Sequence, residues 1–218
     1  MHTINRHAGA QLALWTNPVI LASMRKIILA SQSPWRKKIL EKTGLPFKVI
    51  ESGYEEDLGL KLSPKKLALK MARGKAEAVA AKHPNALIIG ADTFIIFGKE
   101  LLGKPHTATR AKEMLRMLSG KWHDIITGFV IVDSKSGRSA EKVISTRVHL
   151  RAADREEIDA YVRTGEPLQV AGGYAIQGRA GILVDAIEGD YWNIVGLPLS
   201  ALVLELKKFG VRPQVASL

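Results

Sequence analysis

The chain has 218 residues, of which 46% are hydrophobic and 6% aromatic, and it carries a formal charge of +11. This size and apolar content suffice for a packed core, and no apolar run is long enough to cross a membrane. The absence of cysteine excludes disulfides, thiolate metal sites and thiol catalysis, and it fits a reducing cytoplasm.

The excess of positive charge indicates anionic partners. Nucleic acid binding would require aromatic side chains interleaved with the basic clusters, and the sequence lacks this pattern, so nucleic acid is disfavoured. A phosphorylated small molecule needs only a few basic groups that converge on a pocket. The composition therefore favours a small anionic ligand.

Residues 1–23 contain one Arg and no Lys, Asp or Glu. Their apolar stretch is interrupted by Thr16, Asn17 and Pro18, which makes a poor signal sequence. We interpret them as a disordered N-terminal extension, or as the result of a start codon chosen upstream of Met24. Residues 24–218 are expected to form a single domain.

Hydrophobic periodicity and cap residues predict alternating strands and helices. The expected strands are 26–30, 47–51, 86–90, 94–97, 121–132, 141–150 and 181–187. The expected helices are 34–43, 64–82, 108–118, 154–163 and 198–209. This order is typical of an α/β fold with a mixed sheet.

Three basic residues occupy the first turn of the first predicted helix, which has Ser33 as its N-cap. Cations are mildly unfavourable there, because a helix N-terminus already carries partial positive charge. An anionic ligand would explain them, since it would accept backbone N–H groups and a guanidinium together. Arg36 is the strongest candidate contact, whereas Lys37 and Lys38 are expected to be solvated.

Lys75 is a polar residue on the apolar face of the predicted helix 64–82. The other residues of that face are Leu67, Ala68, Met71, Ala78 and Val79. The ammonium could lie at the rim of the core on an apolar stem, or it could reach an anion at the end of the sheet.

Asp92 and Thr93 follow the apolar strand 86–90. Ligands of open α/β sheets collect beyond the carboxyl ends of strands, so Asp92 could be a general base or a metal ligand. Alternatively, its carboxylate closes a bend. Lys104, which lies between Gly103 and Pro105, could supply another cation or be an ordinary loop lysine.

Two further segments could complete a site. Glu55, Glu56 and Asp57 are adjacent acids, and one of them together with Asp92 would suffice for Mg²⁺ or Mn²⁺. Residues 171–181 are glycine-rich and could admit a base or ribose, although their spacing is not a dinucleotide fingerprint. These are the parts needed to bind a polyphosphate with its metal and to hydrolyse it.

Six blocks of the chain resemble the Maf proteins, nucleoside triphosphate pyrophosphatases named for inhibition of septum formation. They span about residues 26–205 and read ILASQSPWRKKIL, GADTF, LLGKP, LSGKWHDIITG, YVRTGEPLQVAGGYAIQGRAG and YWNIVGLPL. The resemblance implies a fold like that of inosine triphosphate pyrophosphatases, with an elongated mixed β-sheet, flanking helices and two lobes around a cleft. It also implies hydrolysis of a nucleoside triphosphate to the monophosphate and pyrophosphate, with Mg²⁺ or Mn²⁺.

The same resemblance assigns roles to residues. It makes Asp92 the proton acceptor and links Glu56, with Asp92, to the metal. The remaining phosphate-binding or catalytic positions fall on Ser31 or Ser33, Arg36, Lys75 and Lys104.

The resemblance leaves the preferred base open. A dTTP- and UTP-preferring branch is marked by Arg, Thr and Gln at three places where a 7-methyl-GTP branch has Trp, Gln and Glu. This chain has Trp35, Thr93 and Gln177. Trp35 could stack on a base or pack in the core against Ile39, and core packing is slightly favoured. The Gln amide can pair with uracil.

We therefore expect pyrimidine (dTTP or UTP) or broad specificity. The alternatives are a 7-methyl-GTP pyrophosphatase, an enzyme that removes modified nucleotides from the pool, and a non-catalytic nucleotide-binding regulator of septum formation and cell division. The resemblance also suggests a homodimer.

Overall fold

The structure is a computed structural model that describes residues 25–57 and 59–213. The proposed extension, residues 1–23, lies outside the described residues. The strands are β1 (Lys26–Leu29), β2 (Phe47–Val49), β3 (Ala86–Phe97), β4 (Glu100–Leu102), β5 (Trp122–Asp133), β6 (Ser139–Leu150) and β7 (Val184–Glu188). The helices are α3 (Pro34–Glu41), α4 (Pro64–Ala80), α5 (Ala108–Leu118), α6 (Arg155–Arg163), α7 (Tyr191–Val195) and α8 (Leu199–Lys207).

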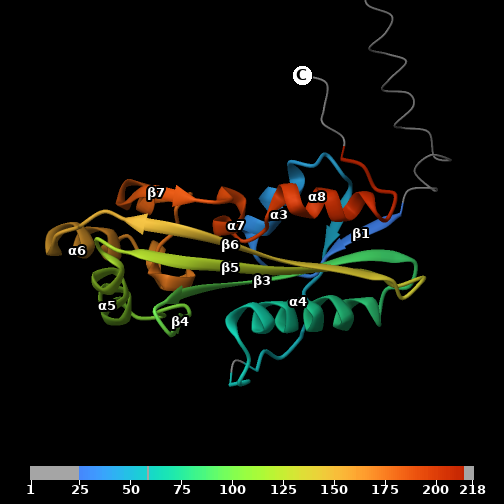
Figure 1. The fold of residues 1–218 in the computed structure, drawn as a ribbon, viewed down its shortest axis with the longest axis horizontal. Coiled ribbons are helices and arrows are strands. Elements are labelled where there is room, and N and C mark those ends of the chain that lie inside the picture. The colour runs from blue at the N-terminus through green and yellow to red at the C-terminus, as the bar shows by residue number, and fades with distance from the viewer. Residues whose placement is uncertain (1–24, 58, 214–218) are drawn as a thin grey trace, which may run out of the picture.

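The strands form one mixed sheet in the order β2–β1–β3–β5–β6–β7, with β4 beside β3. β1 is parallel to β2 and β3, and the other pairs are antiparallel. The long strands β3, β5 and β6 run along the long axis of the molecule (Figure 1). The expected α/β fold, an elongated mixed sheet with flanking helices, is confirmed.

Four elements of the structure, β3, β7, β4 and α7, differ from the sequence prediction. The predicted strands 86–90 and 94–97 are one strand, because β5 pairs with β3 from Leu87 to Ile96 without interruption. Residues 181–183 belong to a 3₁₀ helix, η3 (Arg179–Leu183), so β7 begins later than expected. β4 and α7 were not predicted, because three and five residues are too few to show a period.

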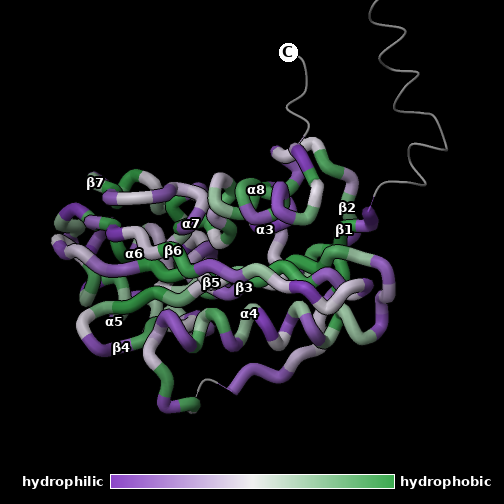
Figure 2. Tube along the Cα trace, turned by 45° about the vertical axis from the view of Figure 1, so that its right-hand side comes forward, coloured by the Kyte–Doolittle hydropathy of each residue, from purple (hydrophilic) through white to green (hydrophobic). Residues whose placement is uncertain are grey.

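Helices cover both faces of the sheet. α4 lies on one face, and α3, α7 and α8 lie on the other (Figure 1). The alternation of β1 explains these layers: Ile27 and Leu29 join the core beneath α8, whereas Ile28 packs with Ala72 and Ala76 of α4. Along α4, hydrophobic and hydrophilic residues alternate in the way expected for a helix with one buried face (Figure 2).

Two glycines bring the backbone of α4 against the sheet. A Cβ at Gly90 would lie 2.2 Å from the carbonyl oxygen of Ala72, and a Cβ at Gly128 would lie 2.7 Å from the carbonyl carbon of Ala68. Real Cβ atoms do not come so close, so only glycine allows this contact. The short distance lets a side chain of α4 reach the polar residues of β3.

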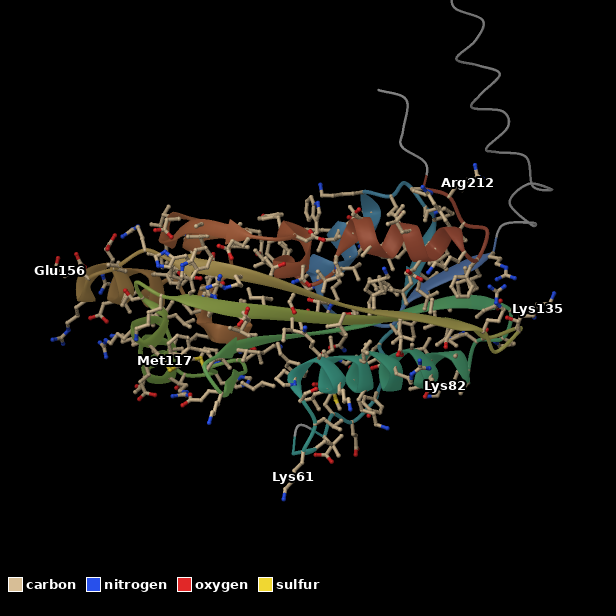
Figure 3. The ribbon with its side chains drawn as sticks, in the orientation of Figure 1. Lys61, Lys82, Met117, Lys135, Glu156 and Arg212 are labelled. Atoms are coloured by element: carbon tan, nitrogen blue, oxygen red, sulfur yellow. The ribbon has the colours of Figure 1, made fainter. Side chains whose placement is uncertain are left out.

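The two ends of the sheet have separate hydrophobic clusters, and the two lobes around a cleft stay a prediction. One hydrophobic cluster gathers around α5 and α6, and others lie beneath α4 and α8. Glu156 and Lys135 mark the opposite ends of the long axis (Figure 3). Within the described residues, no helix is both long and apolar enough to cross a bilayer.

Candidate active site

The middle of β3 has a free edge. On one side, β1 pairs with Ala86–Ile89 and β4 pairs with Ile95–Phe97, so no described strand covers residues 90–94 between them. Asp92 and Thr93 lie in this gap. Successive side chains of a strand point to opposite faces, so Asp92 faces α4 and Thr93 faces α3 and α7.

Lys75 of α4 joins two carboxylates at this edge. Its Nζ lies 2.5 Å from Asp92 Oδ1 and 2.8 Å from Glu56 Oε1. Lys75 is only 9% exposed and Asp92 only 6% exposed. Of the two hypotheses for Lys75, the structure supports the one in which its ammonium reaches an anion at the sheet.

Asp92 has the properties of a general base. Its pKa is raised, chiefly because burial disfavours the charged carboxylate, while the charges of Lys75 and Arg36 oppose the rise. Its Oδ2 is buried and has no hydrogen-bond partner among the described residues. A carboxylate oxygen of raised basicity is therefore left free to accept a proton or to bind a cation.

Glu56 owes its position to a contact that sequence inspection did not reveal. The ring of Tyr54 lies directly on Gly74 of α4, where a Cβ would come within 2.2 Å of the ring. Because Gly74 has no side chain, the segment that carries Tyr54 and Glu56 can lie against α4. Glu56 thereby reaches Lys75, one residue beyond Gly74.

Arg36 points from the start of α3 into the same region. Its Nε donates to the carbonyl oxygen of Gly196 at 2.9 Å, and its terminal nitrogens donate to Thr93 Oγ1 at 3.1 Å and to Ser31 Oγ at 3.4 Å. Burial lowers the pKa of Arg36, and the charges of Asp92 and Glu56 counteract this effect. The guanidinium remains charged at neutral pH, because an arginine pKa starts above 12.

The two candidate serines have different partners. Ser33 is the N-cap of α3, as predicted, and its Oγ accepts from the backbone N–H of Arg36. Ser31 is buried and contacts the guanidinium itself. Both lie at the start of α3, whose partial positive charge favours an anion.

Gly196 was also missed, although it lies in the matching block YWNIVGLPL. Its φ of 118° is a left-handed conformation that favours glycine. A Cβ here would meet Thr93 Oγ1 at 3.5 Å and Arg36 Nε at 3.6 Å. The glycine therefore lets its own carbonyl oxygen turn toward Arg36.

Trp35 and Gln177 lie together on the wall of a cavity of about 480 Å³. The other lining residues, most of them from α3 and α7, are Lys38, Ile39, Glu41, Lys42, Tyr191, Trp192 and Val195. Lys38 lies over the ring of Trp35 at 4.6 Å. Trp35 is half-buried and belongs to none of the core clusters of the described residues, so the structure places it on the cavity wall rather than in the core.

The glycine-rich segment that carries Gln177 is anchored on both sides. Tyr174 forms a buried hydrogen bond of 2.6 Å with His123 Nε2 on β5. Glu166 accepts from the backbone N–H of Arg179 at 3.0 Å. Gln177 is therefore held between two fixed points.

Because His123 is buried, we expect the free energy of unfolding to fall in acid. Burial lowers the pKa of His123 to about 4. Between pH 6.5 and 4, His123 is therefore protonated in the unfolded chain but not in the folded chain. Stability is therefore expected to fall by up to about 3 kcal/mol as the pH drops through this range. Urea unfolding of His123→Gln across this range should lack this component, whereas the partly buried control His83→Gln should retain it.

Lys104 is not brought into this cluster. It is exposed, and none of the ion pairs found in residues 25–57 and 59–213 includes it. Lys37 and Lys38 are exposed as predicted, and Lys37 pairs with Glu41 one turn along α3. Of the three basic residues at the helix start, Arg36 turns toward Asp92 and Thr93, whereas Lys38 lies on the cavity wall over Trp35.

The residues present fit a divalent cation. No group of three or more His, Asp or Glu side chains suited to a metal occurs in the described part of the chain. Mg²⁺ needs only one or two protein carboxylates when water and phosphate oxygens supply the rest. The partnerless Oδ2 of Asp92 and the nearby Glu56 meet that requirement.

Comparison with known proteins shows similarity along most of the chain. A family model described as "Maf-like protein" matches residues 26–209. The chain is 46% identical over 190 residues to a dTTP/UTP pyrophosphatase of Bacillus mycoides (strain KBAB4), with 85% of this chain and 96% of the relative covered. It is 45% identical over 192 residues to a dTTP/UTP pyrophosphatase of Bacillus cereus (strain AH820), with 86% and 97% covered.

Among solved structures, a nucleoside-triphosphatase (dITP/XTP pyrophosphatase) of Mycobacterium abscessus matches at 16% identity with a TM-score of 0.37. It covers 57% of this chain and 72% of the other, a similarity too low to support a conclusion. The family match and the relatives, by contrast, extend over most of the chain. The protein belongs to the Maf family.

Proposed function

We propose that this protein is a metal-dependent nucleoside triphosphate pyrophosphatase that prefers pyrimidine nucleotides. The observation that carries the proposal is the buried pair of Asp92 and Lys75 at the free edge of β3, which the exposed Glu56 joins beside the guanidinium of Arg36. The activity named for the relatives supports the same reaction, because those proteins are described as dTTP/UTP pyrophosphatases.

In this proposal, the triphosphate lies against Ser31 and the start of α3, and Arg36 neutralises its charge. Asp92 takes a proton from the water that attacks the α-phosphorus. The bond between the α-phosphorus and the bridging oxygen then breaks, and pyrophosphate leaves. Lys75 orients Asp92 and balances its charge. A bound Mg²⁺ or Mn²⁺, held by Asp92 and Glu56, would supply further charge neutralisation on the phosphates.

The cavity beside α3 is proposed to hold the base. Trp35 offers an aromatic face for stacking, and Gln177 offers both a donor and an acceptor to the edge of a base. Thr93 and Gln177 favour a pyrimidine, as the relatives do. Trp35 widens the range of bases that could stack, so 7-methyl-GTP and modified pyrimidines belong in the test.

The test is a substrate panel with the purified full-length protein. Pyrophosphate release is measured from dTTP, UTP, CTP, GTP, ATP, 7-methyl-GTP and a modified pyrimidine triphosphate, with Mg²⁺, with Mn²⁺ and with EDTA. We expect the highest kcat/KM for dTTP or UTP, and loss of activity in EDTA. Release from none of the nucleotides by a folded protein would refute the proposal, and a preference for 7-methyl-GTP would replace the pyrimidine assignment.

A second experiment separates catalysis from regulation. A nucleotide-binding regulator of septum formation, which the high positive charge allows, would act on cell division without turnover. Cells that express Asp92→Asn protein distinguish the two, because a regulator would keep its effect on division and an enzyme would lose it. We further propose that the protein acts in the cytoplasm. We also propose that it is a homodimer, which sedimentation would test.

A further inference from the structure

A chain of hydrogen bonds leads from Arg36 into the interior of the protein. Arg36 donates to Thr93 Oγ1 at 3.1 Å, and Thr93 Oγ1 lies 2.9 Å from Thr127 Oγ1. Thr127 Oγ1 in turn lies 3.0 Å from the backbone carbonyl oxygen of Asn193. Thr127 is fully buried on β5, directly opposite Thr93 on β3.

The last acceptor in this series of hydrogen bonds determines which hydroxyl donates in each of them. The carbonyl oxygen of Asn193 can only accept, so the hydroxyl of Thr127 donates to it. The oxygen of Thr127 is then free to accept the hydroxyl proton of Thr93. The competing acceptor for that proton, the carbonyl oxygen of Gly196, is more distant at 3.5 Å.

The carbonyl that sets this direction is firmly held. Asn193 is fully buried at the centre of α7, and its side-chain nitrogen donates to the carbonyl oxygen of Ile125 and to Thr146 Oγ1, both at 3.0 Å. A second buried threonine, Thr146, also holds the start of α7 through Asp190. Thr127 therefore meets a fixed acceptor.

We propose that Thr127 is a positioning residue for base specificity, because it makes Thr93 a hydrogen-bond acceptor toward the bound base. The proposal rests on the proposed function and adds a contact between Thr93 and the base. Thr93 Oγ1 lies by Arg36 and Gly196, which directly follow the cavity-lining residues Trp35 and Val195 in the chain. Once its proton is committed to Thr127, Thr93 can accept from the N3–H of uracil or thymine. It has no proton to offer the N3 of cytosine, which is itself an acceptor.

Gln177 alone cannot distinguish uracil from cytosine. Its amide carries a donor and an acceptor, and rotation by half a turn presents either one to the base. The amide can therefore serve the carbonyl of uracil or the amino group of cytosine. Discrimination between the two bases requires a group whose proton is held in one direction, and Thr93 is held in this way by Thr127.

The test compares UTP with CTP in Thr127→Val and Thr127→Ser protein. Valine has nearly the shape of threonine but cannot accept the proton of Thr93, which then becomes available to cytosine. The ratio of kcat/KM for UTP to that for CTP should fall about tenfold in Thr127→Val, which is the effect expected for one hydrogen bond. Serine restores the hydroxyl, so Thr127→Ser should keep the wild-type ratio.

Thr146→Val is the matched control. It removes another buried hydroxyl that holds α7, so it should lower the melting temperature and leave the UTP-to-CTP ratio unchanged. An equal loss of the ratio in Thr146→Val would show that Thr127 acts only through the stability of α7. An unchanged ratio in Thr127→Val, or equal use of UTP and CTP by the wild type, would overturn the proposal.

Calorimetric binding of UTP and CTP to the same variants separates this inference from the proposed function. Failure of the wild type to hydrolyse any nucleotide would refute the enzyme, but the ratio of the two dissociation constants would still respond to Thr127→Val if the inference holds. An active wild type with no response to Thr127→Val refutes the inference alone.

Discussion

Asp92→Asn protein is expected to release pyrophosphate about 10³-fold more slowly than the wild type. An amide cannot take a proton from the attacking water, whereas its oxygen can still accept from Lys75 at the position that Asp92 Oδ1 occupies. The shape of the site and the charge of Arg36 are unchanged. Nucleotide binding, measured by calorimetric titration, should therefore remain while turnover at saturating nucleotide is lost.

Asp133→Asn is the control for this variant. Asp133 is another buried aspartate of the central sheet, at the far end of β5, where it pairs with Arg25. Its replacement should lower the melting temperature and leave turnover per folded molecule within about twofold of the wild type. Wild-type turnover by Asp92→Asn, or an equal loss in Asp133→Asn, would contradict the role of Asp92 as base.

Those parts of the site that follow from local pattern could be predicted from the sequence. Ser33 as the N-cap, and Lys75 as the polar residue on an apolar face, need only helical spacing. Both features depend on neighbours in the chain, and the structure confirms them. The placement of Asp92 beyond the end of a strand was wrong, because β3 continues through it and only the edge toward β1 and β4 is free there.

Other parts of the site depend on pairs that are distant in the sequence. Thr127 becomes significant only because the β3–β5 register sets it opposite Thr93. Gly196 matters because its carbonyl oxygen meets Arg36, 160 residues away in the chain. No periodicity or spacing indicates such contacts, since they are created by strand pairing and by the packing of a five-residue helix.

Lys104 shows the opposite case. It has the sequence features of a phosphate-binding lysine, between a glycine and a proline. The structure leaves it exposed in the segment after β4, and it forms no ion pair with the Lys75 cluster in the described part of the chain. Its catalytic role therefore remains a prediction, whereas the cluster around Lys75 has a defined geometry on which a mutation can be designed.

Lys75→Met protein is expected to be about 10²-fold slower than the wild type, with an altered pH profile. Methionine keeps the length of the stem and is a good helix former, so α4 should persist. Burial already raises the pKa of Asp92, and Lys75 is the strongest influence that lowers it. Without Lys75 the pKa rises further, so the acid limb of the kcat profile should move to higher pH.

The same change predicts how stability depends on pH. In the variant, the folded chain holds the proton of Asp92 more tightly than the unfolded chain does, so the free energy of unfolding should fall as the pH rises through the raised pKa. Urea unfolding of Lys75→Met should thus show a larger deficit, relative to the wild type, at pH 8 than at pH 5. Lys70→Met, an exposed lysine on the same helix, should show neither the kinetic nor the stability shift. A kinetic limb that stays in place in Lys75→Met would mean that the charge of Lys75 does not control Asp92, and the base would have to be sought elsewhere at the edge of β3.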